Sequence, residues 1–215
     1  MKIRRCIILK EELKNLWNKY ESWCYENYGD ELKLFNESVS NKKLDELMNI
    51  VGYLDDDFKK LYKIHNGEAS GYGMFFGFTF LSIDKIIDEI KFMIPDNSYS
   101  GTSHPEKCIN IEYYNKGWLP IAADGSGNFI GIDYEPDVNG KTGQIINFGR
   151  DERNKYVLSQ NLREFLEILI EEMKKGNIIY SNEGVQLISP NGYKYNHLTD
   201  FMINLKYNNL TCALI

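Results

Sequence analysis

Cysteine and histidine are scarce in this sequence of 215 residues, which has four cysteines and three histidines. Cys6, Cys24, Cys108 and Cys212 are scattered and form no C-x-x-C pair. We therefore expect free thiols, most of them buried, rather than a disulfide framework. An H-E-x-x-H stretch and paired Cys/His sets are also missing, so neither a metal nor another cofactor is expected.

Long apolar runs are missing as well. The N-terminal one extends only from Cys6 to Leu9, whereas the apolar region of a secretory signal needs about 7–15 residues. No run approaches the roughly 20 apolar residues of a membrane span. We expect a cytoplasmic protein that has no membrane partner.

Positive charge is in deficit, because 25 Lys and Arg residues against 31 Asp and Glu residues give a net charge of −6. Nucleic acids attract proteins with clustered Lys and Arg, so no nucleic-acid partner is expected. An acidic surface suits a basic partner protein instead, because opposite charges steer association. The oligomeric state leaves no signal in the sequence.

Catalytic sets are not recognisable. His65, His104 and His197 have no Ser, Cys or acidic partner at a spacing typical of nucleophilic catalysis. His65 lies on the apolar stripe of an expected helix, which favours a packed and hydrogen-bonded side chain over a catalytic base. We therefore predict no catalytic residues and no enzyme. An unrecognised hydrolase, with a triad from distant residues, is the least favoured alternative.

Apolar residues recur with a helical period in most of the chain and alternate as in strands elsewhere. Helices are expected at residues 11–28, 41–51, 55–67, 82–95 and 161–176, and near 200–205. Strands are expected at 73–81, 129–134 and 144–148, with a further hairpin around 190–192. Asp55, Ser82 and Asn161 are suited to cap helices. This order is typical of an α+β fold.

We expect a single domain over residues 1–215. It would have a core at about 40–175, an N-terminal helix at 11–28 and a C-terminal hairpin-plus-helix extension at 177–215. Within the core, the run from Gly73 to Leu81 has large apolar residues at its even positions, so one side of this strand should lie on the core. A polar loop is expected at 95–107.

The segment that most resembles a motif runs from Trp118 to Asn128 and is rich in Asp, Gly, Ser and Asn. Three interpretations of this segment are open. The first is a calcium-binding EF-hand loop, in which Asp124, Ser126 and Asn128 match positions 1, 3 and 5. Glu135 then matches position 12. However, Phe129 stands where that loop needs glycine, and the flanking residues favour strands rather than helices.

The second interpretation is a phosphate-binding loop, but Gly125-Ser126-Gly127 is too short for the known patterns and no helix follows it. The third is structural, and we favour it. Two glycines between two strands permit a tight turn, and Asp124 and Asn128 can hydrogen-bond to the backbone of that turn.

Several blocks of the sequence resemble the SUKH superfamily, and within it the branch named for the fungal Smi/Knr cell-wall-assembly regulators. The blocks are Trp118 to Ala122, Asp124 to Asn128 with Ile132-Asp133, Leu54 to Gly67, Phe76 to Ile83, Gly143 to Ile146, and Phe165-Leu166. The resemblance extends over residues 40–175 or so. Asp55 departs from it, because the family usually has proline there, and the tail after Gly176 lies outside the common core.

The resemblance implies an α+β fold with one central sheet, mainly antiparallel or mixed, flanked by helices. It implies no enzymatic activity. It marks Trp118, Asp124, Asn128, Asp133 and Glu135 as candidates for binding a partner.

Two functions are implied by the resemblance. Many bacterial members are thought to be immunity proteins that bind and neutralise toxins, often nucleases, and a compact chain without long disordered arms is similar to these. Our first expectation is therefore an immunity protein whose acidic surface covers the basic face of a toxin. The alternative is a regulatory or scaffold interaction module in cell-wall or envelope synthesis, as in the fungal members.

Overall fold

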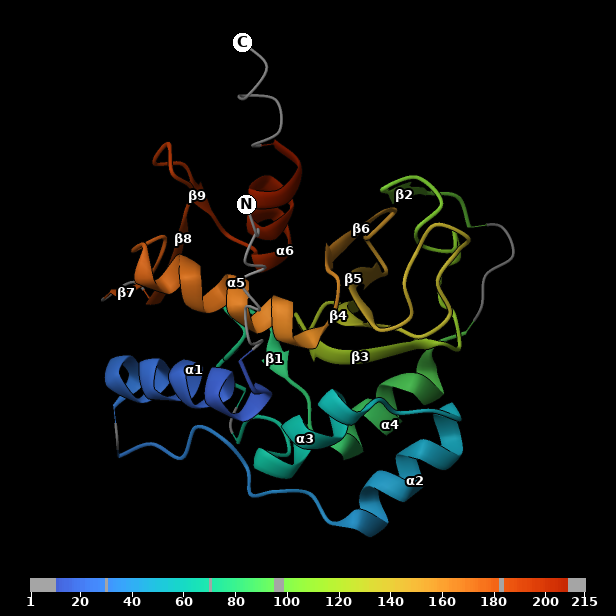
Figure 1. Cartoon of the computed structure of the whole chain (residues 1–215), viewed down its shortest axis with the longest axis horizontal. Coiled ribbons are helices and arrows are strands. Elements are labelled where there is room, and N and C mark those ends of the chain that lie inside the picture. The colour runs from blue at the N-terminus through green and yellow to red at the C-terminus, as the bar shows by residue number, and fades with distance from the viewer. Residues whose placement is uncertain (1–10, 30, 70, 95–98, 182–183, 209–215) are drawn as a thin grey trace, which may run out of the picture.

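The computed structural model describes residues 11–29, 31–69, 71–94, 99–181 and 184–208. Its fold is α+β, as the sequence predicts. Helices surround a mixed six-stranded sheet, and a three-stranded sheet lies at one end of the molecule (Figure 1). Cys24 and Cys108 are buried free thiols, whereas Cys6 and Cys212 lie outside the described residues. None of the helices in these ranges has the length and apolarity that a membrane span requires.

The central sheet has the strand order β1-β3-β4-β5-β6-β2. Its strands are β1 (Thr79–Phe80), β2 (Thr102–His104), β3 (Trp118–Ala123), β4 (Asn128–Asp133), β5 (Gln144–Gly149) and β6 (Asn154–Ser159). Neighbouring strands are antiparallel except β2 and β6, which are parallel. The expected hairpin is β4 and β5. All residues of β3, β4 and β5 are buried, so both faces of the centre of the sheet are covered.

Six α-helices occupy the described residues close to where the apolar periods predict them. They are α1 (Leu13–Tyr28), α2 (Asn41–Val51), α3 (Asp56–Ile64), α4 (Ile83–Phe92), α5 (Leu162–Lys174) and α6 (Leu198–Ile203), which a π-helical turn, η1 (Asn204–Asn208), follows. The side chains of Asp55, Ser82 and Asn161 cap α3, α4 and α5 by accepting a backbone N–H bond, as expected. Pro95, the expected end of α4, lies outside the described residues.

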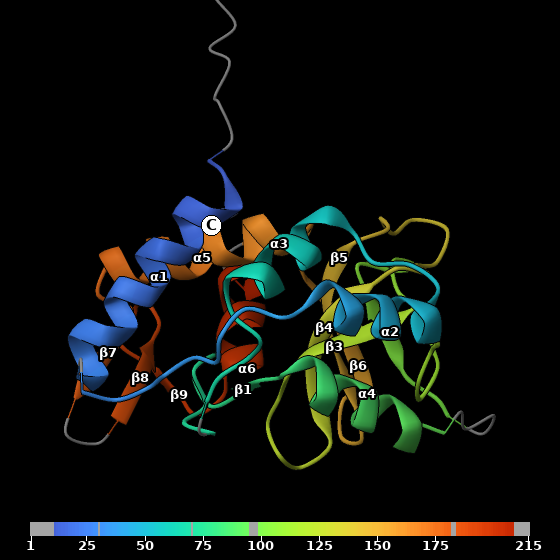
Figure 2. The ribbon, with the colours of Figure 1, turned by 90° about the horizontal axis from the view of Figure 1, so that it is seen from below.

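The helices form two groups around the sheet. α1 and α5 lie side by side, and α3 contacts both (Figures 1 and 2). α2 packs on α4, which in turn contacts β3. Arg163 of α5 donates two hydrogen bonds, each of 2.7 Å, to the carboxylate of Asp57 on α3. This bidentate pair ties together two helices that are far apart in the sequence.

His65 is the packed, hydrogen-bonded side chain that its position predicts. Its Nδ1 lies 2.7 Å from the carbonyl oxygen of Asn36, and its Nε2 lies 3.0 Å from a carboxylate oxygen of Glu21 on α1. Burial lowers the pKa of His65, but these two partners outweigh burial and raise the pKa above its usual value. Both ring nitrogens are therefore used to hold α1 against the loop that precedes α2.

The C-terminal extension contains the expected hairpin and short helix. β8 (Gly184–Ile188) and β9 (Lys194–Tyr195) pair on either side of the turn around Asn191, and β7 (Ile178–Ser181) adds a further antiparallel strand. β7 contacts α5, and α6 contacts β6 of the central sheet. Leu198 and Phe201 of α6 are fully buried, so the extension shares the core of the molecule.

The prediction of a strand from Gly73 to Leu81 is wrong for most of this segment. Only Thr79 and Phe80 form a strand, β1. The preceding residues form a compact loop, residues 71–78, in which Phe76 has a φ of 52°. Such a positive φ is incompatible with a continuous strand and strained for an aromatic residue. Phe75, at an odd position, is buried like the even-numbered rings around it, so the alternation in the sequence does not correspond to two faces of a sheet.

The loop is organised by a carboxylate rather than by a ladder of strands. Glu68 is buried, and its oxygens accept hydrogen bonds from the backbone N–H groups of Gly73 at 3.0 Å, Met74 at 2.8 Å and Phe80 at 2.8 Å. The hydroxyl of Tyr20 on α1 donates to the carbonyl oxygen of Met74. A buried charge of this kind is stable only where donors surround it, and here backbone N–H groups do so.

Two strands of the sheet are not expected from the sequence. β2 lies within the expected polar loop, and β6 begins with polar residues, of which Lys155 is fully buried. The ammonium of Lys155 lies 3.2 Å from the hydroxyl of Tyr99 and 4.9 Å from the centre of the Trp118 ring. Burial lowers the pKa of Lys155 from 10.5 to about 8. Lys155 is buried at a position where the pattern of a strand requires an apolar residue. The sequence therefore does not reveal the apolar face of β6.

We expect Glu68→Ala to lower the free energy of unfolding by roughly 3 kcal/mol or more, because each buried N–H group without a partner costs about 1–3 kcal/mol. Glu68→Gln should cost less, since its amide oxygen still accepts hydrogen bonds. Urea denaturation measures both, and Glu106→Ala, at an exposed position, is the control. Equal stabilities of Glu68→Ala and the control would contradict this role.

A second prediction concerns pH. Because the pKa of Lys155 is lower in the folded state, the unfolded chain binds its proton more tightly, and stability should rise as pH increases from 8 to 10.5. Relative to Lys155→Met, the wild-type free energy of unfolding should gain up to roughly 3 kcal/mol over this range, at 1.36 kcal/mol per pKa unit. Denaturation of both proteins across this pH range measures the gain. A difference that does not vary with pH would show that the lysine titrates normally.

Candidate functional site

The turn between β3 and β4 has the structural role that its sequence predicts. One carboxylate oxygen of Asp124 accepts hydrogen bonds from the backbone N–H groups of Ser126 at 2.7 Å and Asn128 at 3.1 Å. The other accepts the side-chain amide of Asn128 at 2.8 Å. Gly125 and Gly127 have φ values of 78° and 96°, the conformation expected of glycines in a tight turn.

This geometry contradicts the calcium and phosphate interpretations. Asp124 and Glu135 flank opposite ends of β4, a strand of six residues, and are therefore separated by roughly 20 Å. They cannot share one ion. The glycines lead into a strand, so no helix N-terminus is available to a phosphate. No group of three or more His, Cys, Asp or Glu side chains is placed to hold a metal ion in the part of the chain that the structure describes.

The same turn holds the C-terminal extension. Nε2 of His197, the residue before α6, lies 3.6 Å from a carboxylate oxygen of Asp124. Burial raises the pKa of Asp124, but the hydrogen bonds from Asn128 and Ser126 hold it below its usual range, so the carboxylate is charged at neutral pH. Asp124 thus connects the family signature to a segment outside the common core.

The other signature residues are mostly buried. Trp118 and Asp133 are opposite each other on β3 and β4, and both are fully buried. Asp133 accepts the backbone N–H of Glu135 at 3.0 Å and the side-chain amide of Gln144 at 2.9 Å. Burial raises the pKa of Asp133 to about 6. Asn128 is also buried, so of the five candidates only Glu135 is exposed, and a binding role for the five stays a prediction.

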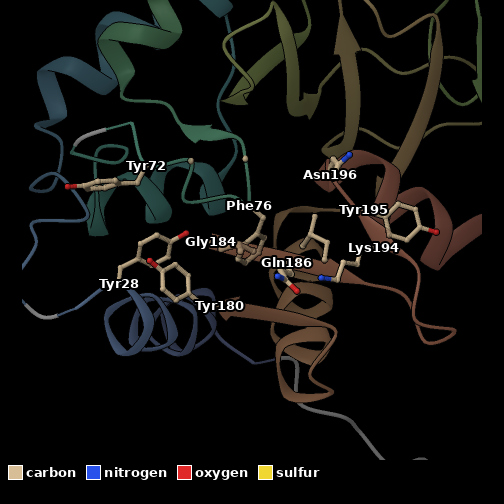
Figure 3. Close-up of a pocket in the computed structure, with 13 residues that line it drawn as sticks. Tyr28, Tyr72, Phe76, Tyr180, Gly184, Gln186, Lys194, Tyr195 and Asn196 are labelled. Atoms are coloured by element: carbon tan, nitrogen blue, oxygen red, sulfur yellow. The ribbon is translucent and has the colours of Figure 1, made fainter. Parts of the chain in front are cut away.

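A cleft of about 460 Å³ lies elsewhere, where α1, the 71–78 loop and the three-stranded sheet meet (Figure 3). We call it the tyrosine cleft. Its wall is built by Tyr28, Tyr72, Gly73, Phe76, Gly77, Tyr180, Gly184, Val185, Gln186, Leu187, Lys194, Tyr195 and Asn196. Two of the three contributing elements, α1 and the three-stranded sheet, lie outside residues 40–175, the range of the resemblance.

Aromatic rings dominate one end of the tyrosine cleft. The rings of Tyr28 and Tyr180 have centroids 4.7 Å apart at an angle of 49°, and Tyr72 lies 6.5 Å from Tyr28 (Figure 3). Tyr72 is 46% exposed and Tyr180 is 39% exposed. Burial raises the pKa of Tyr28, so its hydroxyl remains a hydrogen-bond donor at neutral pH. These rings offer apolar faces and polar edges to a bound molecule.

The rest of the wall is polar but contains no catalytic set. Gln186 and Asn196 provide amide groups, and Lys194 is the single charged residue among the lining side chains. A nucleophile with an adjacent general base is not present among them. The wall therefore has the chemistry of a binding surface.

The sequence did not predict this cleft, because its residues come from three segments that are distant along the chain. The available signal was the number of tyrosines, 15 in the whole chain. Only the packing of the 71–78 loop against α1 and the extension reveals which of them gather at one place.

Comparison with known proteins identifies fungal relatives. KNR4/SMI1 homolog 2 of Debaryomyces hansenii is 28% identical over 212 residues, which cover 77% of this chain and 36% of the relative. The cell wall biosynthesis/cell cycle regulator smi1 of Schizosaccharomyces pombe is 29% identical over 180 residues, 74% of this chain and 36% of the relative. The cell wall assembly regulator SMI1 of Saccharomyces cerevisiae is 27% identical over 160 residues, 55% of this chain and 32% of the relative.

The aligned region is thus only about a third of the length of these relatives. The model of the SMI1/KNR4 family (SUKH-1) matches residues 38–168, which is more than half of the chain. This range includes the central sheet and most of the helices around it. The resemblance seen in the sequence blocks is confirmed, and the chain belongs to the SMI1/KNR4 family.

Proposed function

We propose that this chain is a non-catalytic protein-interaction module in the regulation of cell-wall assembly, and that the tyrosine cleft receives a segment of its partner. The observation that carries the proposal is the cleft itself, an aromatic and largely uncharged surface completed by the segments on both sides of the family core.

The regulatory role is our second expectation from the sequence, and the names of the relatives support it over the immunity role. Two of the three relatives described above are named as regulators of cell-wall assembly or biosynthesis. A further relative, 25% identical over 202 residues, is named a glucan synthesis regulatory protein in Neurospora crassa. No name among these relatives refers to a toxin.

The chemistry of the tyrosine cleft favours a protein segment as its occupant. Tyrosine is enriched among the residues that contribute most to protein interfaces, because a rigid ring buries a large area and its hydroxyl retains a hydrogen bond. Tyr72 and Tyr180 are partly exposed in the free chain and would be covered by a partner. The amide of Asn196, an exposed residue, suits the backbone groups of an extended segment.

Histidine chemistry supports binding rather than hydrolysis. Both ring nitrogens of His65 are engaged within the fold, and His197 contacts Thr199 and Asp124 at the base of α6. His104 stacks on Tyr156, with ring centroids 4.6 Å apart. None of these three side chains lines the tyrosine cleft.

The proposal predicts that Tyr72→Ala/Tyr180→Ala loses its partners without losing stability. The tagged chain would be purified from its native cell and the bound proteins identified by mass spectrometry. Wild type should retain several proteins of wall synthesis, and the cleft variant should retain about tenfold less of them, since interface tyrosines contribute up to several kcal/mol. Tyr53→Ala/Phe92→Ala is the matched control, because these aromatics are 54% and 81% exposed outside the cleft.

Two outcomes would contradict the proposal. Equal capture by the cleft variant and wild type would remove the cleft from the interaction. Capture of one dedicated toxin, whose toxicity the chain relieves on co-expression, would establish the immunity role instead.

A further inference from the structure

A second concave surface concentrates positive charge on this acidic protein. It is a hollow of about 920 Å³ between α1, α3 and α5, and we call it the basic groove. Its cationic side chains are Lys14, Lys59, Lys60, Lys63 and Arg163, whereas only Glu12 and Asp56 among its lining residues are acidic. The whole chain has a net charge of −6, so the groove has the opposite sign to the rest of the molecule.

The basic groove and the tyrosine cleft are separate surfaces. Lys14 is near the start of α1, whereas Tyr28 of the tyrosine cleft is its last residue. A helix of 16 residues is roughly 24 Å long. Figure 2 shows α1 running from α3, beside the groove, towards β7 and β8, beside the cleft.

Two of the five cations have structural partners. Arg163 is held in its bidentate pair with Asp57, and the ammonium of Lys63 donates to the carbonyl oxygen of Val39 at 2.8 Å. Lys14, Lys59 and Lys60 differ from these. They have no ion pair with any residue in the described ranges.

The lysines of α3 lie close to one another in the free chain. Lys59 and Lys63 are four residues apart on α3, and Lys60 and Lys63 are three apart, so each pair lies on one helix face. Like charges at these spacings repel each other on the helix surface. The groove then brings Lys14 from α1 to the same place. Bound carboxylates would relieve this repulsion.

The residues that line the groove further limit the chemical class of the partner. Ile64, which is half-buried, provides an apolar contact among the lysines, and this suits an apolar side chain flanked by acidic ones. The guanidinium of Arg163, the group best shaped for phosphate, is already occupied by Asp57.

We propose that the basic groove is a docking site for an acidic, aspartate- and glutamate-rich segment of a partner protein. The proposal deepens the proposed function by giving the chemistry of a second contact, at a surface that does not overlap the tyrosine cleft.

The test uses a fluorescein-labelled peptide, Glu-Asp-Glu-Leu-Asp-Glu-Asp, and fluorescence anisotropy with the full chain. Wild type should bind it, and more weakly as NaCl is added. Lys14→Glu/Lys59→Glu/Lys60→Glu should weaken binding by at least about tenfold, because it reverses the complementary charge. The corresponding triple glutamine variant should show a smaller loss.

The control is Lys42→Glu/Lys116→Glu/Lys141→Glu, which changes the net charge equally at exposed lysines outside the groove. It should bind the peptide within about twofold of wild type, as should the cleft variant Tyr72→Ala/Tyr180→Ala. The two proposals can fail separately. A cleft variant that loses its cellular partners but still binds the peptide supports a role of the tyrosine cleft that is independent of the basic groove. A groove variant that loses the peptide but keeps its cellular partners shows the opposite. Thermal melting establishes that each variant is folded.

Three results would overturn the docking site. They are no binding of the acidic peptide by wild type, an equal loss in the groove variant and the control, and equally tight binding of an oligothymidylate of the same charge. The first result would show that the groove does not bind acidic peptides. The second would show that binding depends only on the net charge of the protein. The third would show that the groove binds anions of any kind.

Discussion

The hydrogen bonds that the carboxylate of Glu68 accepts determine the path of the chain beside the tyrosine cleft. This carboxylate accepts three backbone N–H groups of the 71–78 loop and of β1, and so replaces the ladder of hydrogen bonds that a strand would provide. Because the loop is held from inside, its outer side is free to form a wall of the tyrosine cleft. Tyr20 joins the same loop to α1, which places Tyr28 on the opposite wall.

The helices could be predicted from the sequence because their signals are local. Apolar residues repeat within each helix, and Asp55, Ser82 and Asn161 cap the helices from within one turn. The turn at Asp124 is equally predictable, since the hydrogen bonds that the Asp124 carboxylate accepts come from Ser126 and Asn128 within the turn. The family signature then provided the fold class, although its most distinctive residues proved to organise the sheet.

The features that could not be predicted depend on contacts between distant segments. The run from Gly73 has the alternation of a strand, and only the buried carboxylate of Glu68 turns it into a loop. β6 cannot be predicted because Lys155 interrupts its apolar pattern. The ammonium of this lysine lies over aromatic rings from other parts of the chain. The tyrosine cleft and the basic groove each combine three segments, so neither has a motif. Their residues are ordinary tyrosines and lysines until the fold assembles them.

Two surfaces of different chemistry thus lie at the two ends of α1. Both depend on a rigid connection between α1 and the segments that pack against it. Hydrogen exchange, followed residue by residue by NMR, measures that rigidity directly. The account predicts that the amides of Gly73, Met74 and Phe80 exchange as slowly as those of β4, to within about tenfold, because all are held by the global fold. Exchange of these three amides at the rate of an open loop would contradict it.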